Sequence, residues 1–435
     1  MNSLKRQTMS VITRVLFTGL LAFTGLGLFA QNLDKAKELL KANKLPEAKT
    51  EIDKVLAVDK NQKNGEAWYT KLKVYNALAA SETLKAQYPE ARMQALEALK
   101  KYTEVDDKKL LLLQMEAYKP VNEIYQGFFQ IGANEYNAGK YADALTNFSG
   151  ALQTSEFMNS KGWTTLKIDT TSTLYAGISA EKAGKKDSAA IYYGRLADAK
   201  ISAINGSNMI DIYKWLVDHY SQKKDEANTN KYLALGKAQY PEDLFWGTTE
   251  LDAAREKGNK DSLFAKYAEI TTAFPKNHLF FFNYGLEMYQ YATDTTNGKK
   301  APANAAELTV KAEESLKKCL ELQPDYPQAA LVLGQIHYNA GVELQGMTKT
   351  VPGKLPADIK KRADMRIAAQ KKFDEAIPYF EKVEQDLGAK GKLKMDEKNS
   401  LKDAYDLLIN IYESKNLKEK VDTYTAKFNS VDKDH

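Results

Sequence analysis

Hydrophobic residues recur along most of this chain with the spacing of paired amphipathic helices. The clearest case is residues 128–152, FFQIGANEYNAGKYADALTNFSGAL, where apolar positions follow a helical period on both sides of a Gly-Lys pair. Gly139 before Lys140 marks a tight turn, because glycine accepts the positive φ that ends many helices. Gly132 and Ala144 are small where two helices must approach closely. The segment therefore predicts two antiparallel helices joined by a tight turn.

This arrangement resembles the tetratricopeptide repeat (TPR), whose period is about 34 residues. The residues that match the signature of that family are Phe128, Ile131, Gly132, Gly139, Ala144, Phe148 and Ala151. Glu135 departs from the signature, because the family usually has an aromatic residue there. Further copies include Gly177, Gly184, Leu251, Gly258, Ala330, Gly334 and Phe380, and weaker copies include Ala36, Trp68, Ile212 and Leu408.

A single helical pair cannot bury its apolar face, whereas stacked pairs form one continuous core. We therefore expect an all-α, α-solenoid fold of about nine TPR-like helical hairpins, right-handed by family resemblance. Polar insertions are expected at residues 153–172, 293–304 and 346–356, and no strand-like alternation is sustained. The predicted segments are the N-terminal repeats at 31–157, the central repeats at 158–275, and the C-terminal repeats with a capping helix at 276–435.

Residues 1–30 have the charge and hydropathy order of a secretory signal peptide. Lys5, Arg6 and Arg14 precede an apolar run at residues 15–29, which Ala30 follows. Cleavage after Ala30 would leave a mature chain with no transmembrane span, whereas retention would make the segment a membrane anchor. No cysteine lies near the junction to carry a lipid. We expect a periplasmic or otherwise exported protein.

The charge balance argues against a nucleic-acid partner. Lys and Arg number 62 against 57 Asp and Glu, and loss of Lys5, Arg6 and Arg14 would lower the net charge from +5 to +2. Charges of both signs alternate along the chain, as on solvated helix faces. The only cysteine is Cys319, so no intramolecular disulfide can form, and stability must come from packing.

Candidate catalytic and metal-binding residues are sparse. His219 lies beside Asp218, and His337 falls on a position that usually faces the core, but no HExxH or CxxC motif is present. Cys319 takes a position that is normally a buried Ala, where a thiol is inert. We therefore expect no enzyme activity, no metal site and no cofactor.

A stripe one residue beyond the core positions of each first helix is a candidate partner-binding groove. It consists of Phe129, Tyr136, Leu174, Ile178, Phe282, Leu286, Tyr289, Leu331, Gln335 and Tyr338. An apolar, Tyr-edged groove suits an amphipathic helix or an extended peptide. Coverage of the stripe by neighbouring helices is the alternative. TPR proteins that clamp a C-terminal carboxylate place Lys and Asn on this stripe, and the positions compared, such as Phe129 and Ala133, lack them.

The layout also resembles periplasmic repeat proteins of Bacteroidota. The resemblance rests on Ala30–Gln31, on the helix at Trp68–Tyr75, and on the pattern of HYNAGVEL, insertion and FDEAIPYFEKV. It implies lineage and compartment only. The expected function is a periplasmic scaffold for protein–protein interaction, with an unidentified protein or peptide partner such as a cell-envelope or secretion component. The alternative is a periplasmic protein that binds a glycan or small ligand.

Overall fold

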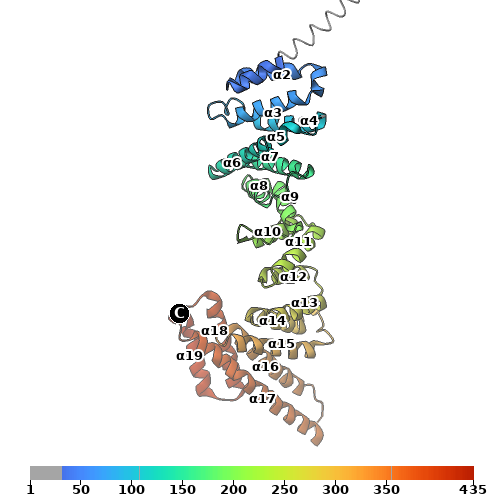
Figure 1. Ribbon diagram of the computed structural model, residues 1–435. Coiled ribbons are helices and arrows are strands. Elements are labelled where there is room, and N and C mark those ends of the chain that lie inside the picture. Colours follow the sequence, from blue (N-terminus) through green and yellow to red (C-terminus); the bar gives the residue numbers. More distant parts are fainter. Residues whose placement is uncertain (1–31, 107, 354) are drawn as a thin grey trace, which may run out of the picture. The chain divides into compact units, whose positions relative to one another are not determined.

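The computed structural model describes residues 32–106, 108–353 and 355–435, and it is built almost entirely from helices (Figure 1). The chain forms two compact units, one ending at Trp246 and the other beginning at Gly247. The three-part division of the repeats stays a prediction beside these two units. The predicted signal peptide lies outside the described residues.

The helices of the N-terminal unit follow one another as antiparallel pairs. A helix at residues 32–41 precedes α2 (Leu45–Leu56), the 3-10 helix η1 (Asp59–Lys63), α3 (Gly65–Ala80), α4 (Ala91–Val105), the short α5 (Leu111–Met115), α6 (Lys119–Asn137), α7 (Tyr141–Ser160), α8 (Thr170–Lys182), α9 (Lys186–Asp198), α10 (Ile210–Gln222) and α11 (Glu226–Gln239). Helix α12 (Leu244–Glu256) begins in this unit and ends in the next.

The C-terminal unit continues the same alternation with longer helices. Its elements are α13 (Lys260–Ala273), α14 (His278–Thr293), the 3-10 helix η2 (Thr296–Gly298), α15 (Ala305–Leu322), α16 (Pro327–Thr348), α17 (Pro356–Leu387), α18 (Met395–Ser414) and α19 (Lys418–Asp434). The loops before α15 and α17 fall in the predicted insertions at 293–304 and 346–356.

Hairpins stack within each unit through their first helices. In the N-terminal unit α3 contacts α6, and in the C-terminal unit α14 contacts α16, which contacts α18. The second helix of one hairpin also contacts the first helix of the next, as α7 does with α8 and α17 with α18. The predicted all-α solenoid of TPR-like hairpins is confirmed.

Close approach within a hairpin depends on a glycine that faces an aromatic ring. A Cβ added at Gly132 of α6 would lie 3.2 Å from the Phe148 ring of α7, and one at Gly177 of α8 would lie 2.6 Å from the Tyr193 ring of α9. Phe148 and Tyr193 are themselves buried. The small residue in the predicted signature is therefore required because the ring of the second helix packs directly on the backbone of the first.

The turns within hairpins share a left-handed backbone conformation. Gly139, Gly184 and Gly258 have φ of 74°, 75° and 70°, and a Cβ at each would meet open space. Lys224 and Asn416 take the same place in their hairpins with φ of 58° and 56°. The turn therefore requires the conformation and not the glycine, although glycine adopts it at least cost.

One short β-hairpin interrupts the helices between α9 and α10. Ala203–Ile204 (β1) pairs antiparallel with Ser207–Asn208 (β2). Asn205 and Gly206 connect them with φ of 49° and 81°, as a two-residue primed turn requires. These strands are too short to produce a sustained alternation in the sequence.

Candidate functional site

The ten predicted groove residues all lie on the first helices of hairpins. Phe129 and Tyr136 are on α6, and Leu174 and Ile178 are on α8 of the same unit. The others belong to the C-terminal unit, on α14 (Phe282, Leu286, Tyr289) and α16 (Leu331, Gln335, Tyr338). Tyr289 and Leu331 are buried and the remaining eight are half-buried, so none is exposed.

Neighbouring aromatic rings account for much of this burial. The Phe129 ring meets Phe148 edge to face at 5.7 Å between centroids, and Phe282 meets Tyr326 in the same way at 5.0 Å. Tyr289 of α14 is held by α16, since its Oη accepts a 2.7 Å hydrogen bond from Asn339 Nδ2. Packing therefore occupies a large part of the stripe, and its role in binding stays a prediction.

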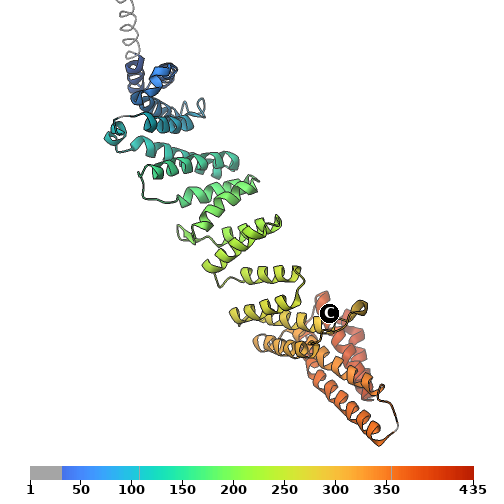
Figure 2. The same cartoon turned by 90° about the vertical axis from the view of Figure 1, so that its right-hand side faces the viewer.

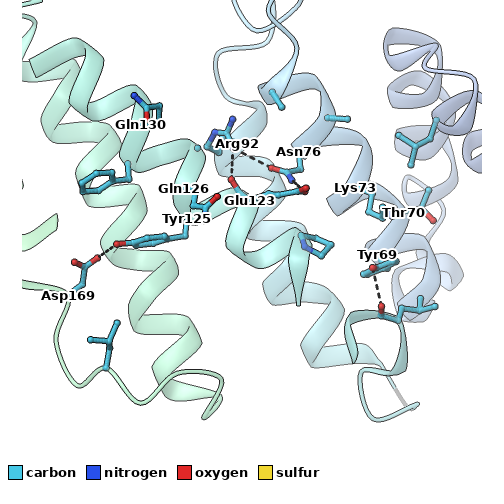
Figure 3. A pocket seen from close by; sticks show the side chains of 18 of the residues that line it. Tyr69, Thr70, Lys73, Asn76, Arg92, Glu123, Tyr125, Gln126, Gln130 and Asp169 are labelled. Carbon is cyan, nitrogen blue, oxygen red and sulfur yellow. Dashed lines mark hydrogen bonds between the residues drawn. The ribbon is translucent and has the colours of Figure 1, made fainter. Parts of the chain in front are cut away.

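A cavity of about 1380 Å³ opens on the first-helix face of the N-terminal unit. Its walls are α3 and α6, with the helix at residues 32–41 and the segment 166–171 at its ends (Figure 3). Of the predicted groove residues, Phe129 lines it. The cavity therefore lies on the same face as the predicted groove. It lies nearer the N-terminus than most of the predicted groove residues do.

Aromatic and aliphatic side chains form the apolar part of this cavity. Tyr69 on α3, Tyr125 and Phe129 on α6, and the exposed Leu166 all line it. The Tyr125 and Phe129 rings stack at 6.4 Å between centroids. Such surfaces gain free energy when a ligand removes them from water, at about 25 cal/mol per Å² of apolar area.

Arg92 of α4 reaches between α3 and α6 and is 7% exposed (Figure 3). Its guanidinium donates to the backbone oxygens of Ala79 at 3.0 Å and Glu123 at 3.1 Å, and to Asn76 Oδ1 at 3.4 Å. A Cβ at Gly127 of α6 would collide with this guanidinium. Arg92 therefore fixes the C-terminal end of α3 against α6, which sets the width of the cavity there.

Burial shifts the pKa of Arg92 downward, and the Glu123 carboxylate opposes that shift. The Arg92 Nε is buried and has no hydrogen-bond partner. Asn76, also buried, donates to Glu123 Oε2 at 2.9 Å. Arg92, Asn76 and Glu123 thus form one polar network at the junction of three helices.

A tyrosine attaches the far end of the cavity to α6. Tyr125 Oη donates a 2.8 Å hydrogen bond to Asp169 Oδ2, and Asp169 Oδ1 in turn caps α8 by accepting from the Ser172 backbone N–H at 3.0 Å. Burial raises the pKa of Tyr125 to about 12, so its hydroxyl stays protonated and able to donate. The segment 166–171 is therefore positioned by one side chain of α6.

The charges that line the cavity are nearly balanced. Lys37, Lys41, Lys73 and Arg92 face Glu66, Glu123 and Asp169. Lys37 pairs with Glu66, and Lys73 pairs with Glu116 at 2.6 Å. Burial acts to raise the pKa of Glu116, but its interactions with Lys73 and Tyr69 outweigh that effect and lower the pKa. This pattern suits a ligand of mixed polarity better than a polyanion.

The sequence contained a signal for this site that the stripe omitted. Trp68, Leu72 and Tyr75 follow the core period of a weak repeat, and the positions one residue beyond are Tyr69, Lys73 and Asn76. All three line the cavity. This repeat carries Lys73 and Asn76 on its stripe, which are the residue types that a carboxylate clamp uses. Both are already engaged, Lys73 by Glu116 and Asn76 by Glu123.

The residues considered for chemistry are buried in packing environments. Cys319 is fully buried, and burial raises the pKa of its thiol to about 11. His337 is buried between Glu313 and Glu375, with its ring nitrogens 3.4 and 3.2 Å from their carboxylates. His219 is buried against Trp215. For both histidines burial is the main cause of a lowered pKa.

The described residues offer neither a cluster of metal ligands nor a membrane-spanning helix. No group of three or more His, Cys, Asp or Glu side chains in this part of the chain is arranged to hold a metal ion. None of the described helices has the length and apolar character needed to cross a membrane.

Comparison with known proteins leaves the family of this chain open. No family model matches the sequence, and no curated protein matches it. Solved structures that are similar include PilW, a type IV pilus biogenesis factor, at 16% identity over 57% of this chain and 95% of that chain, with a TM-score of 0.25.

Two other similar structures cover more of this chain. The TPR domain of P58(IPK) is 14% identical over 87% of this chain and 98% of that chain, with a TM-score of 0.26. Human IFIT1, solved as a dimer with PPP-AAAA, is 12% identical over 91% and 89%, with a TM-score of 0.23. TM-scores this low carry no argument about function. The TPR-like description therefore rests on the hairpins, the glycine–ring contacts and the turns of this chain itself.

Proposed function

We propose that this protein is a periplasmic, non-enzymatic TPR-like scaffold that binds an extended peptide segment of a cell-envelope or secretion component. The compartment is inferred from the signal-like residues 1–30 and from the resemblance to periplasmic repeat proteins of Bacteroidota. The peptide-binding role is inferred from the first-helix face of the N-terminal unit.

The observation that carries the proposal is the cavity between α3 and α6. Its volume of about 1380 Å³ exceeds the range of about 300–1,000 Å³ that small-molecule sites usually occupy. A space of this size, open along several helices, fits several residues of a peptide. Its rings can receive apolar side chains, and its polar groups can pair with a peptide backbone.

Two of the polar groups available to a peptide are side-chain amides of α6. Gln126 and Gln130 are exposed and line the cavity one helical turn apart. Gln130 donates to Asn134, which leaves its carbonyl oxygen as an acceptor. An amide side chain offers both a donor and an acceptor, so it can satisfy a peptide N–H and C=O without a fixed charge.

Crosslinking in intact cells tests this function. A photoreactive residue at Gln126 should capture one reproducible protein, whereas the same residue at the exposed Gln153 on α7 should not. Capture of the same proteins from both positions would contradict a specific groove partner. If no protein is captured while a sugar or metabolite raises the melting temperature, the glycan- or small-ligand-binding function replaces this one.

A further inference from the structure

The hairpin of α16 and α17 is much longer than its core requires. Its helices have 22 and 32 residues. Burial on α17 begins at Ala369, and no residue from 356 to 368, all of them described, is buried. In both views the connected ends of these two helices extend beyond the other helices of the C-terminal unit (Figures 1 and 2). We call residues 342–353 and 355–368 the hairpin tip.

Large apolar side chains of the hairpin tip are exposed to solvent. The exposed fractions are 41% for Met347, 68% for Leu355, 54% for Ile359 and 70% for Ile367. On α17, Ile359, Ala363 and Ile367 are spaced four residues apart, so they lie along one side of the helix. Scattered exposed apolar residues are ordinary, but several on one projecting end indicate a contact surface.

Positive charge is concentrated at the same place. Residues 342–368 contain six Lys and Arg against three Asp and Glu, a net charge of +3 in 27 residues, whereas the whole chain of 435 residues has a net charge of only +5. Among the described residues, no ion pair involves Lys349, Lys360, Lys361 or Arg366, although lysines of the solenoid such as Lys372 are paired. These four cations are therefore available to an external anionic surface.

The loop at the end of the hairpin is held in place by Arg362. Its guanidinium donates to the backbone oxygens of Val351 at 3.1 Å and Gly353 at 2.9 Å. These bonds tie the loop before Leu355 to the first turns of α17. The apolar and charged side chains are thus presented on a tethered loop and helix.

We propose that the hairpin tip docks onto the surface of an anionic lipid bilayer. Helices that lie at the surface of anionic membranes bind through apolar side chains that stand beside Lys and Arg. The apolar residues would enter the headgroup region, and each cation near the surface would add about 1 kcal/mol of attraction. A nucleic acid would need the cations but would leave Leu355, Ile359 and Ile367 exposed, so the membrane accounts for more of the surface.

Flotation of the purified full chain with lipid vesicles tests this proposal. Binding to vesicles that contain phosphatidylglycerol should exceed binding to phosphatidylcholine vesicles and should weaken as salt rises. The double variant Lys360→Glu/Lys361→Glu should lower the partition coefficient on the anionic vesicles at least about tenfold. Ile359→Asp/Ile367→Asp should lower it to a similar extent.

Matched controls keep the result specific to the tip. Lys257→Glu/Lys276→Glu makes the same charge change at exposed lysines outside the tip, and Ile191→Asp changes an exposed isoleucine on α9. Both should bind as the original chain does, and circular dichroism should show that all variants remain folded. Residues 1–30 are common to all of them, so their contribution cancels.

Two outcomes would overturn the proposal. The first is unchanged vesicle binding in both tip variants. The second is a general polyanion site, in which Lys360→Glu/Lys361→Glu abolishes binding to duplex DNA while Ile359→Asp/Ile367→Asp leaves vesicle binding intact. Neither outcome depends on the cavity of the N-terminal unit, so the proposed peptide-binding function is tested separately.

Discussion

The first helices of the two units use equivalent faces in different ways. In the N-terminal unit α3 and α6 leave a cavity of about 1380 Å³ on that face. In the C-terminal unit Tyr289 of α14 reaches α16, where it donates to the backbone oxygen of Gln335 at 3.4 Å and accepts from Asn339. At the position of α3 that corresponds to Tyr289, Asn76 donates to Glu123 of α6 at 2.9 Å and also lines the cavity. Both side chains therefore join neighbouring first helices, but the short amide of Asn76 fills less of the face than the ring of Tyr289 does.

The four tryptophans separate the units in experiments. Trp68, Trp163, Trp215 and Trp246 all belong to the N-terminal unit. Of the four, Trp246 lies on α12, which continues into the C-terminal unit, so the fluorescence reports mainly the unfolding of the N-terminal unit, whereas circular dichroism reports both units. Each variant below can therefore be assigned to one side of the comparison.

The largest effect is expected for Gly127→Ala. The new methyl group would occupy the space of the Arg92 guanidinium, which would lose its bonds to Ala79 and Glu123. We expect a loss of about 3 kcal/mol in the stability of the N-terminal unit, since a buried charge is left without partners. Urea denaturation followed by tryptophan fluorescence measures it.

A matched glycine provides the control for this loss. A Cβ at Gly247 of α12 would lie 3.5 Å from Phe274, an ordinary contact. Gly247→Ala should be neutral or stabilising, because alanine favours a helix by about 1 kcal/mol. Equal losses in the two variants would show that the Arg92 network does not set the stability of the cavity region.

Tyr289→Phe should open the C-terminal face at a smaller cost. It removes the hydroxyl that joins α14 to α16, and we expect a loss of about 1–2 kcal/mol. The loss should appear in circular dichroism and not in tryptophan fluorescence. A shift of the fluorescence transition would mean that the hydroxyl does not act within its own unit.

Tyr125→Phe tests the cavity of the N-terminal unit, because it releases the segment 166–171 at one end of that cavity. Loss of the hydrogen bond to Asp169 should cost about 1 kcal/mol, since the carboxylate remains free to meet water. Because the segment 166–171 is no longer tied to α6, the yield of crosslinking from Gln126 should fall clearly, although the protein loses little stability. Unchanged crosslinking would show that this segment takes no part in binding.

The smallest effects are expected at the turns, which the two units share. Lys224→Gly relieves a left-handed lysine in the N-terminal unit and should stabilise it by about 0.5–1 kcal/mol. Asn416→Gly in the C-terminal unit should gain less, because asparagine already tolerates this conformation. Chemical denaturation measures both. A larger gain at Asn416 would contradict a purely conformational effect.

The hairpins could be predicted because their determinants are local. Gly132 and Phe148, or Gly177 and Tyr193, lie in one hairpin, so their spacing is visible in the sequence. The β-hairpin carried a local signal too, the Asn205–Gly206 turn, but its strands are too short to show a period.

The cavity could be predicted only in part, because it depends on contacts between hairpins. Tyr69, Lys73 and Asn76 follow the stripe rule and could have been found in α3. The Arg92 contact with Gly127 and the Tyr125 bond to Asp169 join segments that no periodicity relates. They exist because stacked helices come together, and that geometry is not written in any one repeat.

The glycine–ring contacts of the longest hairpin fix its register. Gly334 packs against Phe380 and Gly341 against Phe373, so both helices advance by seven residues between contacts, in opposite directions. Adding or removing seven residues in both α16 and α17 would preserve this pairing of glycines with rings. It would change the length of the hairpin by about 10 Å. The length of this hairpin can therefore change during evolution in steps of seven residues per helix, and the repeats that carry the hairpin stay undisturbed.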